Sequence, residues 1–308
     1  MPPNDANSGR KSIAIIGLGS IGGVVAGLLS ATGRYDIFAC MRRGIEKLTV
    51  ERAEGAVEVP ITALTDPAQA RSVDWVLLCT KAQDTAAGTA WLQRLCVAST
   101  RVAALQNGIG HADRLRPLVG GATVVPTIVY YNGERLAPDR VRYRRTGEHD
   151  FCVADDADGR AFAGLFDGTS LVTFVSDDFN TLAWRKLLLN AAANPISALT
   201  MQRNHVFRRD DIKALCRALL HEAIAVARAD GARLPADEAE QAIGRLLAVP
   251  ADAGSSMYFD RMAGRPLEID ALTGAVVAAG ERHGIATPLN RMLLTLARAA
   301  REVKVGGA

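Results

Sequence analysis

The strongest constraint on the fold is a glycine-rich turn near the start of the chain. Gly17-Leu18-Gly19-Ser20-Ile21-Gly22 has the spacing G-x-G-x-x-G and directly follows the β-branched run 12–17. An apolar stretch without charged residues continues to about Ser30, as in a buried helix. Strand, turn and helix in this order open a βαβ unit of the dinucleotide-binding type, in which the helix N-terminus binds a pyrophosphate. The alternative is a glycine-rich packing turn without a ligand.

The two halves of the chain differ in pattern. Strand-like runs alternate with helical stretches in the first half, which predicts βαβ units and a parallel sheet. These runs are 35–40, 73–79, 102–105 and 123–131, with a mixed polar and apolar stretch typical of antiparallel edge strands at 140–153. From about Asp178 the pattern is helical, with further helices expected at 237–247, 256–263 and 268–283 and after Thr287-Pro288.

We therefore expect an α/β protein with an N-terminal Rossmann-type domain and an all-helical C-terminal domain. The expected boundaries are 1–177 for the NADP-binding domain and 178–308 for a helical domain suited to substrate binding and dimerisation. Residues 1–10 are polar and are expected to be disordered.

Composition excludes several classes of protein. The 308 residues carry 36 Lys and Arg against 33 Asp and Glu, so the net charge of +3 does not indicate nucleic-acid binding. Five scattered cysteines form no C-x-x-C motif, which favours a reducing cytoplasm over a disulfide scaffold. No histidine or cysteine cluster has metal-ligand spacing, and the glycines within 12–33 argue against a membrane span. We expect no metal, nucleic-acid or membrane partner.

The residues after the second strand bear on the choice of cofactor. An NAD-binding site usually places Asp or Glu there, about twenty residues beyond the glycines, whereas this chain has Met41-Arg42-Arg43. A guanidinium binds a 2′-phosphate bidentately, so Arg42 favours NADP(H) over NAD(H). A solvated arginine pair is the alternative, and it suits Arg43 better than Arg42.

Two further polar residues follow later strands. Lys81 comes after the third predicted strand and Asn107 after the fourth. Ligands of open α/β sheets bind outside the carboxyl ends of the strands, so both side chains are candidates for the same crevice as the glycine turn. The alternative is that neither side chain binds a ligand, and that Lys81 is an ordinary surface lysine and Asn107 an ordinary turn asparagine.

The most informative segment is WRKLLLNAAANPISALT at 184–200. Lys186, Asn190 and Asn194 are spaced i, i+4 and i+8, so they lie on one helical stripe among leucines and alanines. Buried ammonium and amide groups need partners, which points to water or a polar ligand. Pro195 removes one helical hydrogen bond and predicts a kink. The alternative is that Lys186 extends to solvent and that the asparagines cap local backbone.

With these motifs the chain resembles the ketopantoate reductases (2-dehydropantoate 2-reductases), from Ile13 to about Leu296. The resemblance rests on GLGSIG at 17–22, Lys81 in CTKAQ, Asn107 in QNG, WRKLLLNAAANP at 184–195 and SSMYFD…E at 255–268. It implies an NADPH-dependent reductase with its active site between the two domains, acting on ketopantoate on the route to pantothenate and coenzyme A. A homodimer is possible.

The resemblance also assigns roles to individual residues. It implies Lys186 as the catalytic proton donor, and Lys186, Asn190, Asn194, Asn204 and Ser256 as substrate-binding residues. The cofactor-binding residues would be Gly17, Leu18, Gly19, Ser20, Ile21, Gly22, Arg42, Lys81, Asn107 and Glu268. The loop 126–133 departs from the family pattern, and Tyr130 and Tyr131 are expected to narrow the pocket. The alternatives are a reductase of another small 2-oxo acid and a non-catalytic NADPH-sensing protein.

Overall fold

The computed structural model describes residues 9–301 and divides into two compact units. The N-terminal unit runs up to Gln106 and continues as Gly110–Phe179. The helical unit comprises Asn107–Ile109 and the chain from Asn180 onward. The chain thus divides after Phe179, whereas the sequence led us to expect a boundary after residue 177. The prediction of disorder concerns residues 1–10, of which 1–8 lie outside the described residues. Gly9 and Arg10 form a bend before the first strand.

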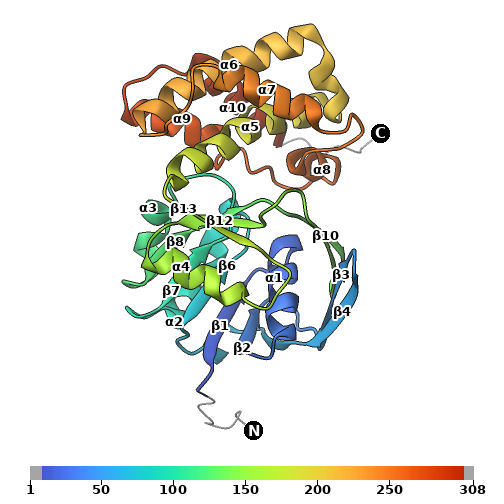
Figure 1. Ribbon diagram of the computed structural model, residues 1–308, viewed down its shortest axis with the longest axis vertical. Helices are drawn as coiled ribbons and strands as arrows, with labels where there is room; N and C mark the ends of the chain where they lie inside the picture. The colour runs from blue at the N-terminus through green and yellow to red at the C-terminus, as the bar shows by residue number, and fades with distance from the viewer. Residues whose placement is uncertain (1–8, 302–308) are drawn as a thin grey trace. The chain divides into compact units, whose positions relative to one another are not determined.

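The N-terminal unit is built on a six-stranded parallel sheet with the order β5-β2-β1-β6-β7-β8 (Figure 1). Its strands are β1 (Lys11–Ile16), β2 (Tyr35–Cys40), β5 (Thr62–Leu64), β6 (Trp75–Leu78), β7 (Arg101–Ala104) and β8 (Thr123–Pro126). All four residues of β6 are buried, as are the last four of β1. Strands covered on both faces appear in a sequence as continuous apolar runs, which is why they could be predicted.

Helices and two smaller sheets complete this unit. The helices are α1 (Ser20–Ala31), α2 (Thr89–Leu95), α3 (His111–Leu115) and α4 (Ala157–Ala163). The second sheet has the order β10-β11-β3-β4 and packs on α1, and the third has the order β13-β12-β9. Their strands are β3 (Lys47–Arg52), β4 (Gly55–Pro60), β9 (Ile128–Val129), β10 (Asn132–Ala137), β11 (Arg140–Arg144), β12 (Phe151–Ala154) and β13 (Thr173–Ser176).

Two expectations about these strands were wrong in part. The run 123–131 is not one strand, because β8 ends at Pro126 and β9 pairs with β12 in another sheet. Within 140–153, β11 is antiparallel to β10 but parallel to β3, and β12 is antiparallel to β9 but parallel to β13. Each of these strands therefore lies inside its sheet instead of forming its edge.

Between residues 180 and 301 the regular elements of the helical unit are all helices, drawn in yellow-green to red in Figure 1. The helices are α5 (Phe179–Thr200), α6 (Asp210–Ala229), α7 (Glu238–Ala248), α8 (Ser256–Met262), α9 (Thr273–Arg282) and α10 (Pro288–Arg301). The helix expected at 268–283 begins only at Thr273, because turns in which Glu268 and Ile269 carbonyls accept backbone amides occupy the preceding residues. The two units together confirm the predicted fold class, a Rossmann-like sheet followed by an all-helical part.

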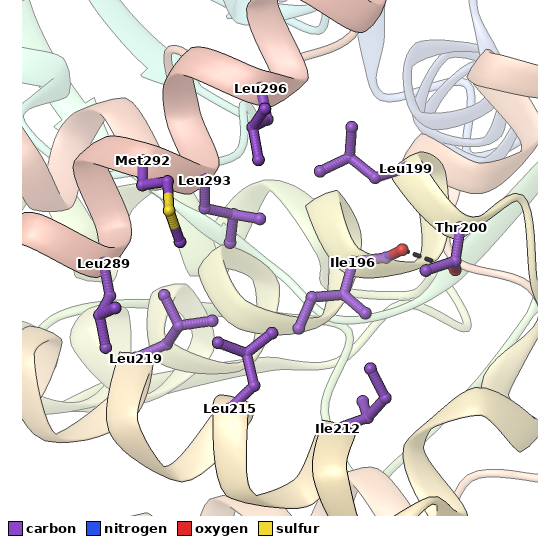
Figure 2. Close-up of a pocket in the computed structure, with 10 residues that line it drawn as sticks. All are labelled: Ile196, Leu199, Thr200, Ile212, Leu215, Leu219, Leu289, Met292, Leu293 and Leu296. Atoms are coloured by element: carbon purple, nitrogen blue, oxygen red, sulfur yellow. Dashed lines mark hydrogen bonds between the residues drawn. The ribbon is translucent and has the colours of Figure 1, made fainter.

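An apolar pocket of about 170 Å³ lies between α5, α6 and α10 (Figure 2). Its lining includes Ile196, Leu215 and Leu293, and its one polar side chain is Thr200, whose hydroxyl donates to the Ile196 carbonyl. Such a pocket offers no charge for a carboxylate and therefore does not suit an oxo acid. Within residues 9–301, no helix combines the length and hydrophobicity needed to cross a bilayer.

Candidate active site

The three glycines of the motif differ in the space that a side chain would find at each position. Gly17 has φ +95°, and a Cβ there would lie 2.9 Å from the Thr80 backbone nitrogen. A Cβ at Gly22 would lie 2.1 Å from the Gly17 carbonyl oxygen. Both positions therefore need glycine for the protein's own packing. A Cβ at Gly19, in contrast, would meet no heavy atom within 4 Å among the described residues, its chain neighbours aside. Packing does not explain this glycine, whereas the close approach of a ligand does.

The start of α1 is suited to an anion. Gly19 is its N-cap, without a side-chain cap, and the first turn carries no acidic residue. Its first amides therefore have no helical partner, and the helix dipole places partial positive charge beside them. Leu18 is buried under the turn, and Ser20 and Ile21 form the first turn. These features fit the pyrophosphate of a dinucleotide.

Tyr131 supports this turn and does not line a pocket. Its side chain is only 3% exposed, and its hydroxyl donates to the Ile21 carbonyl at 2.9 Å. The ring packs edge-on against Tyr143 and Phe151. Burial raises the pKa of the Tyr131 phenol well above its usual value. The expectation that Tyr131 narrows the substrate pocket was wrong, because the side chain belongs to the core beneath α1.

The candidate cofactor residues at the ends of β2 and β6 lie near the surface. Arg42 and Arg43 follow β2 and are exposed, and neither pairs with another residue of 9–301. Lys81 follows β6 and is half-buried. Their positions at the carboxyl ends of the two strands that flank β1 agree with a role in binding phosphate or ribose.

Gln106 fixes the segment that carries Lys81, a role that the sequence did not reveal. Its amide nitrogen donates to the Thr80 carbonyl at 2.9 Å and lies 3.0 Å from the Thr85 hydroxyl. Its amide oxygen accepts from Arg114 at 2.8 Å. A buried amide with partners on three segments holds the end of β6 rigidly. The only signal in the sequence is a polar residue at the end of an apolar strand.

Asn107 leaves the sheet and belongs to the helical unit, together with Gly108 and Ile109. Its side-chain amide donates to the Glu268 carboxylate at 3.3 Å. Gly108 has φ +98°, and a Cβ there would lie 2.4 Å from the Ala271 carbonyl oxygen. Two candidate cofactor residues, 161 positions apart in the chain, are thus brought into direct contact.

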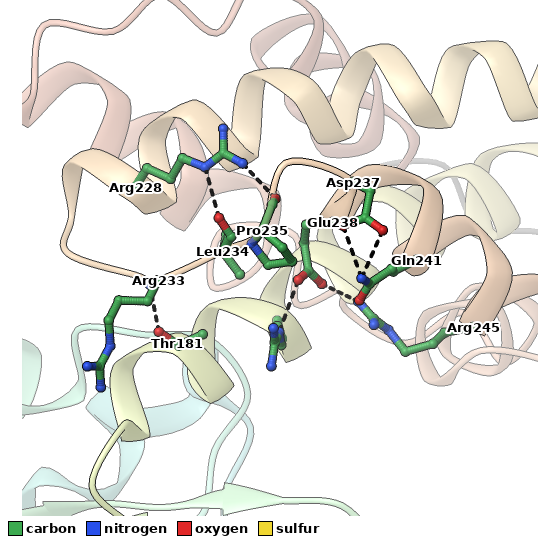
Figure 3. Close-up of polar contacts among 10 residues, drawn as sticks. Thr181, Arg228, Arg233, Leu234, Pro235, Asp237, Glu238, Gln241 and Arg245 are labelled. Carbon is green, nitrogen blue, oxygen red and sulfur yellow. Dashed lines mark hydrogen bonds and ion pairs between the residues drawn. The ribbon is translucent and has the colours of Figure 1, made fainter.

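The neighbours of Lys186 fix the orientation of α5. The Trp184 indole donates to Asp230 at 2.9 Å, and Arg185 pairs with Glu238 at 3.1 Å. Glu238 is fully buried and also pairs with Arg245 (Figure 3). Breaking a buried pair of this kind is costly, so α5 is held firmly against α7 and the loop after α6. These two contacts are made by the neighbours of Lys186, and the Lys186 side chain itself points to another part of the helical unit, away from Asp230 and Glu238.

Lys186 faces Glu268, and its environment makes it a better acid than an ordinary lysine. Burial lowers the pKa of the ammonium from 10.5 to about 8, while the negative charge of Glu268 acts in the opposite direction. The leucines and alanines around Lys186 account for this direction, because an apolar environment disfavours the charged ammonium. A lysine with a pKa near 8 is mostly charged at neutral pH and can give up its proton within a catalytic cycle.

Asn190 and Asn194 follow Lys186 on the same stripe of α5. Asn194 is only 6% exposed and Asn190 is half-buried. Within the described part of the chain, neither side-chain amide hydrogen-bonds to another residue. The alternative that these asparagines cap local backbone is therefore wrong for the described residues. A nearly buried amide without a protein partner points to a polar ligand.

Asn204 differs from these two residues. Its amide nitrogen donates to the carbonyls of Leu246 and Val249, at 3.0 and 2.9 Å, at the C-terminal end of α7. The side chain is 7% exposed. Both amide hydrogens are used to cap α7, so only the carbonyl oxygen is left for a substrate. The structure thus gives Asn204 a structural role that the resemblance did not imply.

A chain of hydroxyls connects Asn194 to the start of α8. Ser197 donates to the Asn194 carbonyl at 3.0 Å and lies 2.6 Å from the Ser255 hydroxyl, which accepts from the Tyr258 amide. Because Ser197 has one proton, Ser255 donates to Ser197. Ser255 is therefore the N-cap of α8 and fixes Ser256, which is exposed, as its first residue.

Comparison with known proteins places this chain in a family. A family model described as "Ketopantoate reductase PanE/ApbA" matches residues 13–155, and one described as its C terminal part matches 178–301. The chain belongs to the ketopantoate reductase family. It is similar to the 2-dehydropantoate 2-reductase of Caulobacter vibrioides, with 38% identity over 94% of this chain and 99% of that protein. The 2-dehydropantoate 2-reductase of Mycobacterium tuberculosis is 40% identical over 94% of this chain and 98% of its own.

A solved structure agrees with this membership. The PanE/ApbA family ketopantoate reductase of Ralstonia eutropha JMP134 has a TM-score of 0.84 and 30% identity, covering 94% of this chain and 98% of that chain. Both matched family regions contain candidate site residues, from the glycine turn in the first to Lys186, Asn190, Asn194 and Glu268 in the second. The site described here therefore lies in the parts of the chain that carry the family relationship.

Proposed function

We propose that this protein is an NADPH-dependent 2-dehydropantoate 2-reductase, which reduces the 2-oxo group of ketopantoate to the hydroxyl of pantoate. Membership of the family and the names of its relatives support this substrate. One observation carries the proposal furthest: Asn194 is nearly buried, its side-chain amide has no hydrogen-bond partner among residues 9–301, and it shares a helical stripe with Lys186. An ammonium and an unpaired side-chain amide on one helical stripe, two turns apart, suit the separate oxygen atoms of a small oxo acid.

The cofactor side of the proposal rests on the glycine turn. Gly17–Gly22 would bind the pyrophosphate at the start of α1, and Arg42 would pair with the 2′-phosphate that distinguishes NADPH from NADH. Lys81, Asn107 and Glu268 would bind the rest of the dinucleotide. When bound, NADPH supplies a hydride from nicotinamide C4 to the 2-oxo carbon.

The protein's own contribution is orientation and proton transfer. Asn190, Asn194 and Ser256 would bind the carboxylate and hydroxyl of the substrate. The Lys186 ammonium would donate a hydrogen bond to the 2-oxo oxygen, stabilise the negative charge that develops there, and then give up its proton to complete the alcohol. Lys186 regains a proton from water after product release.

The experiment that tests this function is NADPH oxidation with a panel of 2-oxo acids. We expect ketopantoate to have the highest kcat/KM. A higher kcat/KM with another 2-oxo acid would favour the related reductase, and binding of NADPH without turnover of any panel member would favour the NADPH-sensing protein.

We also keep the predictions of a homodimer and of a cytoplasmic location, and the five free thiols support the latter.

A further inference from the structure

The break in the hydrogen bonding of α5 lies in the middle of the candidate substrate site. In a regular helix the amide of residue 195 would donate to the carbonyl of Ala191, but Pro195 has no N–H. The Ala191 carbonyl lies between Asn190 and Asn194 in the chain, and Ala191 is only 1% exposed. A buried carbonyl without a donor is costly, so this part of α5 needs a donor from elsewhere.

Thr273 supplies that donor. Its hydroxyl donates to the Ala191 carbonyl at 3.0 Å, and Thr273 is fully buried as the first residue of α9. Thr273 and Ala191 are 82 positions apart in the sequence. The Thr273 hydroxyl thus bonds to the one α5 carbonyl that has no helical amide donor because residue 195 is proline. This bond also holds the start of α9 against α5. Glu268, which acts on Lys186, lies in the turn just before α9.

We propose that Thr273 is a positioning residue: its hydroxyl replaces the amide that Pro195 lacks and holds Lys186, Asn190 and Asn194 in the arrangement that binds and protonates the substrate. This inference rests on the proposed function. Thr273 itself takes no part in proton transfer. Its effect is transmitted through the backbone of α5 and through the placement of Glu268 beside Lys186.

A double-variant cycle tests the bond directly. Thr273→Val removes the hydroxyl at nearly constant volume, and Pro195→Ala restores the amide that can donate to Ala191. In the wild-type background we expect Thr273→Val to raise KM for ketopantoate and to lower kcat/KM about tenfold, while Kd for NADPH stays within about twofold. In the Pro195→Ala background the same change should lower kcat/KM by less than about threefold, because the carbonyl already has a donor.

Two controls separate positioning from a loss of stability alone. Thr273→Ser keeps the hydroxyl and should retain most of the wild-type kcat/KM. Thr200→Val removes another hydroxyl from α5, one that donates to the Ile196 carbonyl at 2.8 Å (Figure 2). That carbonyl can still accept the helical amide of residue 200, so this change should leave KM and kcat nearly unchanged.

The outcomes decide between the two roles. If Thr273→Val lowers only the melting temperature, with KM, kcat and the pH profile of the folded enzyme unchanged, the positioning role is wrong. If the loss is equally large with Pro195→Ala, Thr273 does not act through the Ala191 carbonyl. Should Thr273→Val alone fail to fold, an active double variant supports the inference and an inactive one overturns it. An inactive wild type would instead refute the proposed function.

Discussion

Raising the pH through the pKa of Lys186 should switch off its proton donation. Burial lowers the pKa of this ammonium to about 8, so it loses its proton near physiological pH and not above pH 10. At pH 7 about nine lysines in ten would carry the proton, and at pH 9 about one in ten. We therefore expect kcat/KM to fall about tenfold between pH 7 and pH 9, and about tenfold again for each further pH unit.

Glu268→Gln should move this fall to lower pH. The carboxylate raises the pKa of Lys186, so removing its charge leaves burial as the main effect and lowers that pKa further. At pH 8 the variant should therefore hold fewer protonated lysines than the wild type, and the two profiles should converge at lower pH. The assay is the initial rate of NADPH oxidation against pH, with Kd for NADPH measured in parallel because Glu268 is also a candidate cofactor residue.

The control is another carboxylate near the same helix. Glu281 on α9 is exposed and pairs with Arg291, so Glu281→Gln should leave the basic limb of the profile in place. A limb that stays at the wild-type pH in Glu268→Gln, or moves to higher pH, would refute the reasoning. The group reported by the profile would then not be a lysine beside Glu268.

Three other predictions concern the choice of cofactor, the roles of two asparagines and the stability cost of burying Lys186. Arg42→Ala should reduce the preference for NADPH over NADH by about 1–3 kcal/mol in binding titrations, and an effect confined to Arg43→Ala would move the assignment by one residue. Asn194→Ala should lower kcat/KM with little change in melting temperature, whereas Asn204→Ala should lower the melting temperature because α7 loses its cap. Lys186→Met should stabilise the fold by about 3 kcal/mol below pH 8, because burial penalises the ammonium there, and denaturant titrations should show this gain vanish as pH rises towards 10.5.

The parts of the fold that the sequence predicts are those in which one local pattern decides. β1 and β6 are buried on both faces, so their runs of apolar residues are sufficient evidence. The glycine turn could be predicted because Gly17 and Gly22 have no room for a side chain. The spacing of Lys186, Asn190 and Asn194 places them on one stripe wherever α5 packs.

The parts that could not be predicted depend on contacts between distant segments. Asn107 follows a strand, yet it belongs with the helices because its amide reaches Glu268. Asn204 has the residue type of a substrate ligand, but the end of α7 takes both its amide hydrogens. The hairpin of β3 and β4 is signalled only by alternating valines and leucines around Gly55, which has φ +119°.

The central claim is that Lys186 supplies the proton, and the turnover of Lys186→Ala tests it most directly. Loss of a general acid usually costs about 10²–10⁴-fold, so kcat for ketopantoate should fall by at least about 10²-fold. Kd for NADPH should remain close to that of the wild type, because we propose that the phosphates bind at the glycine turn and not at Lys186. A Lys186→Ala enzyme that keeps most of its kcat would contradict proton donation by Lys186. The lysine would then have only a structural role in packing.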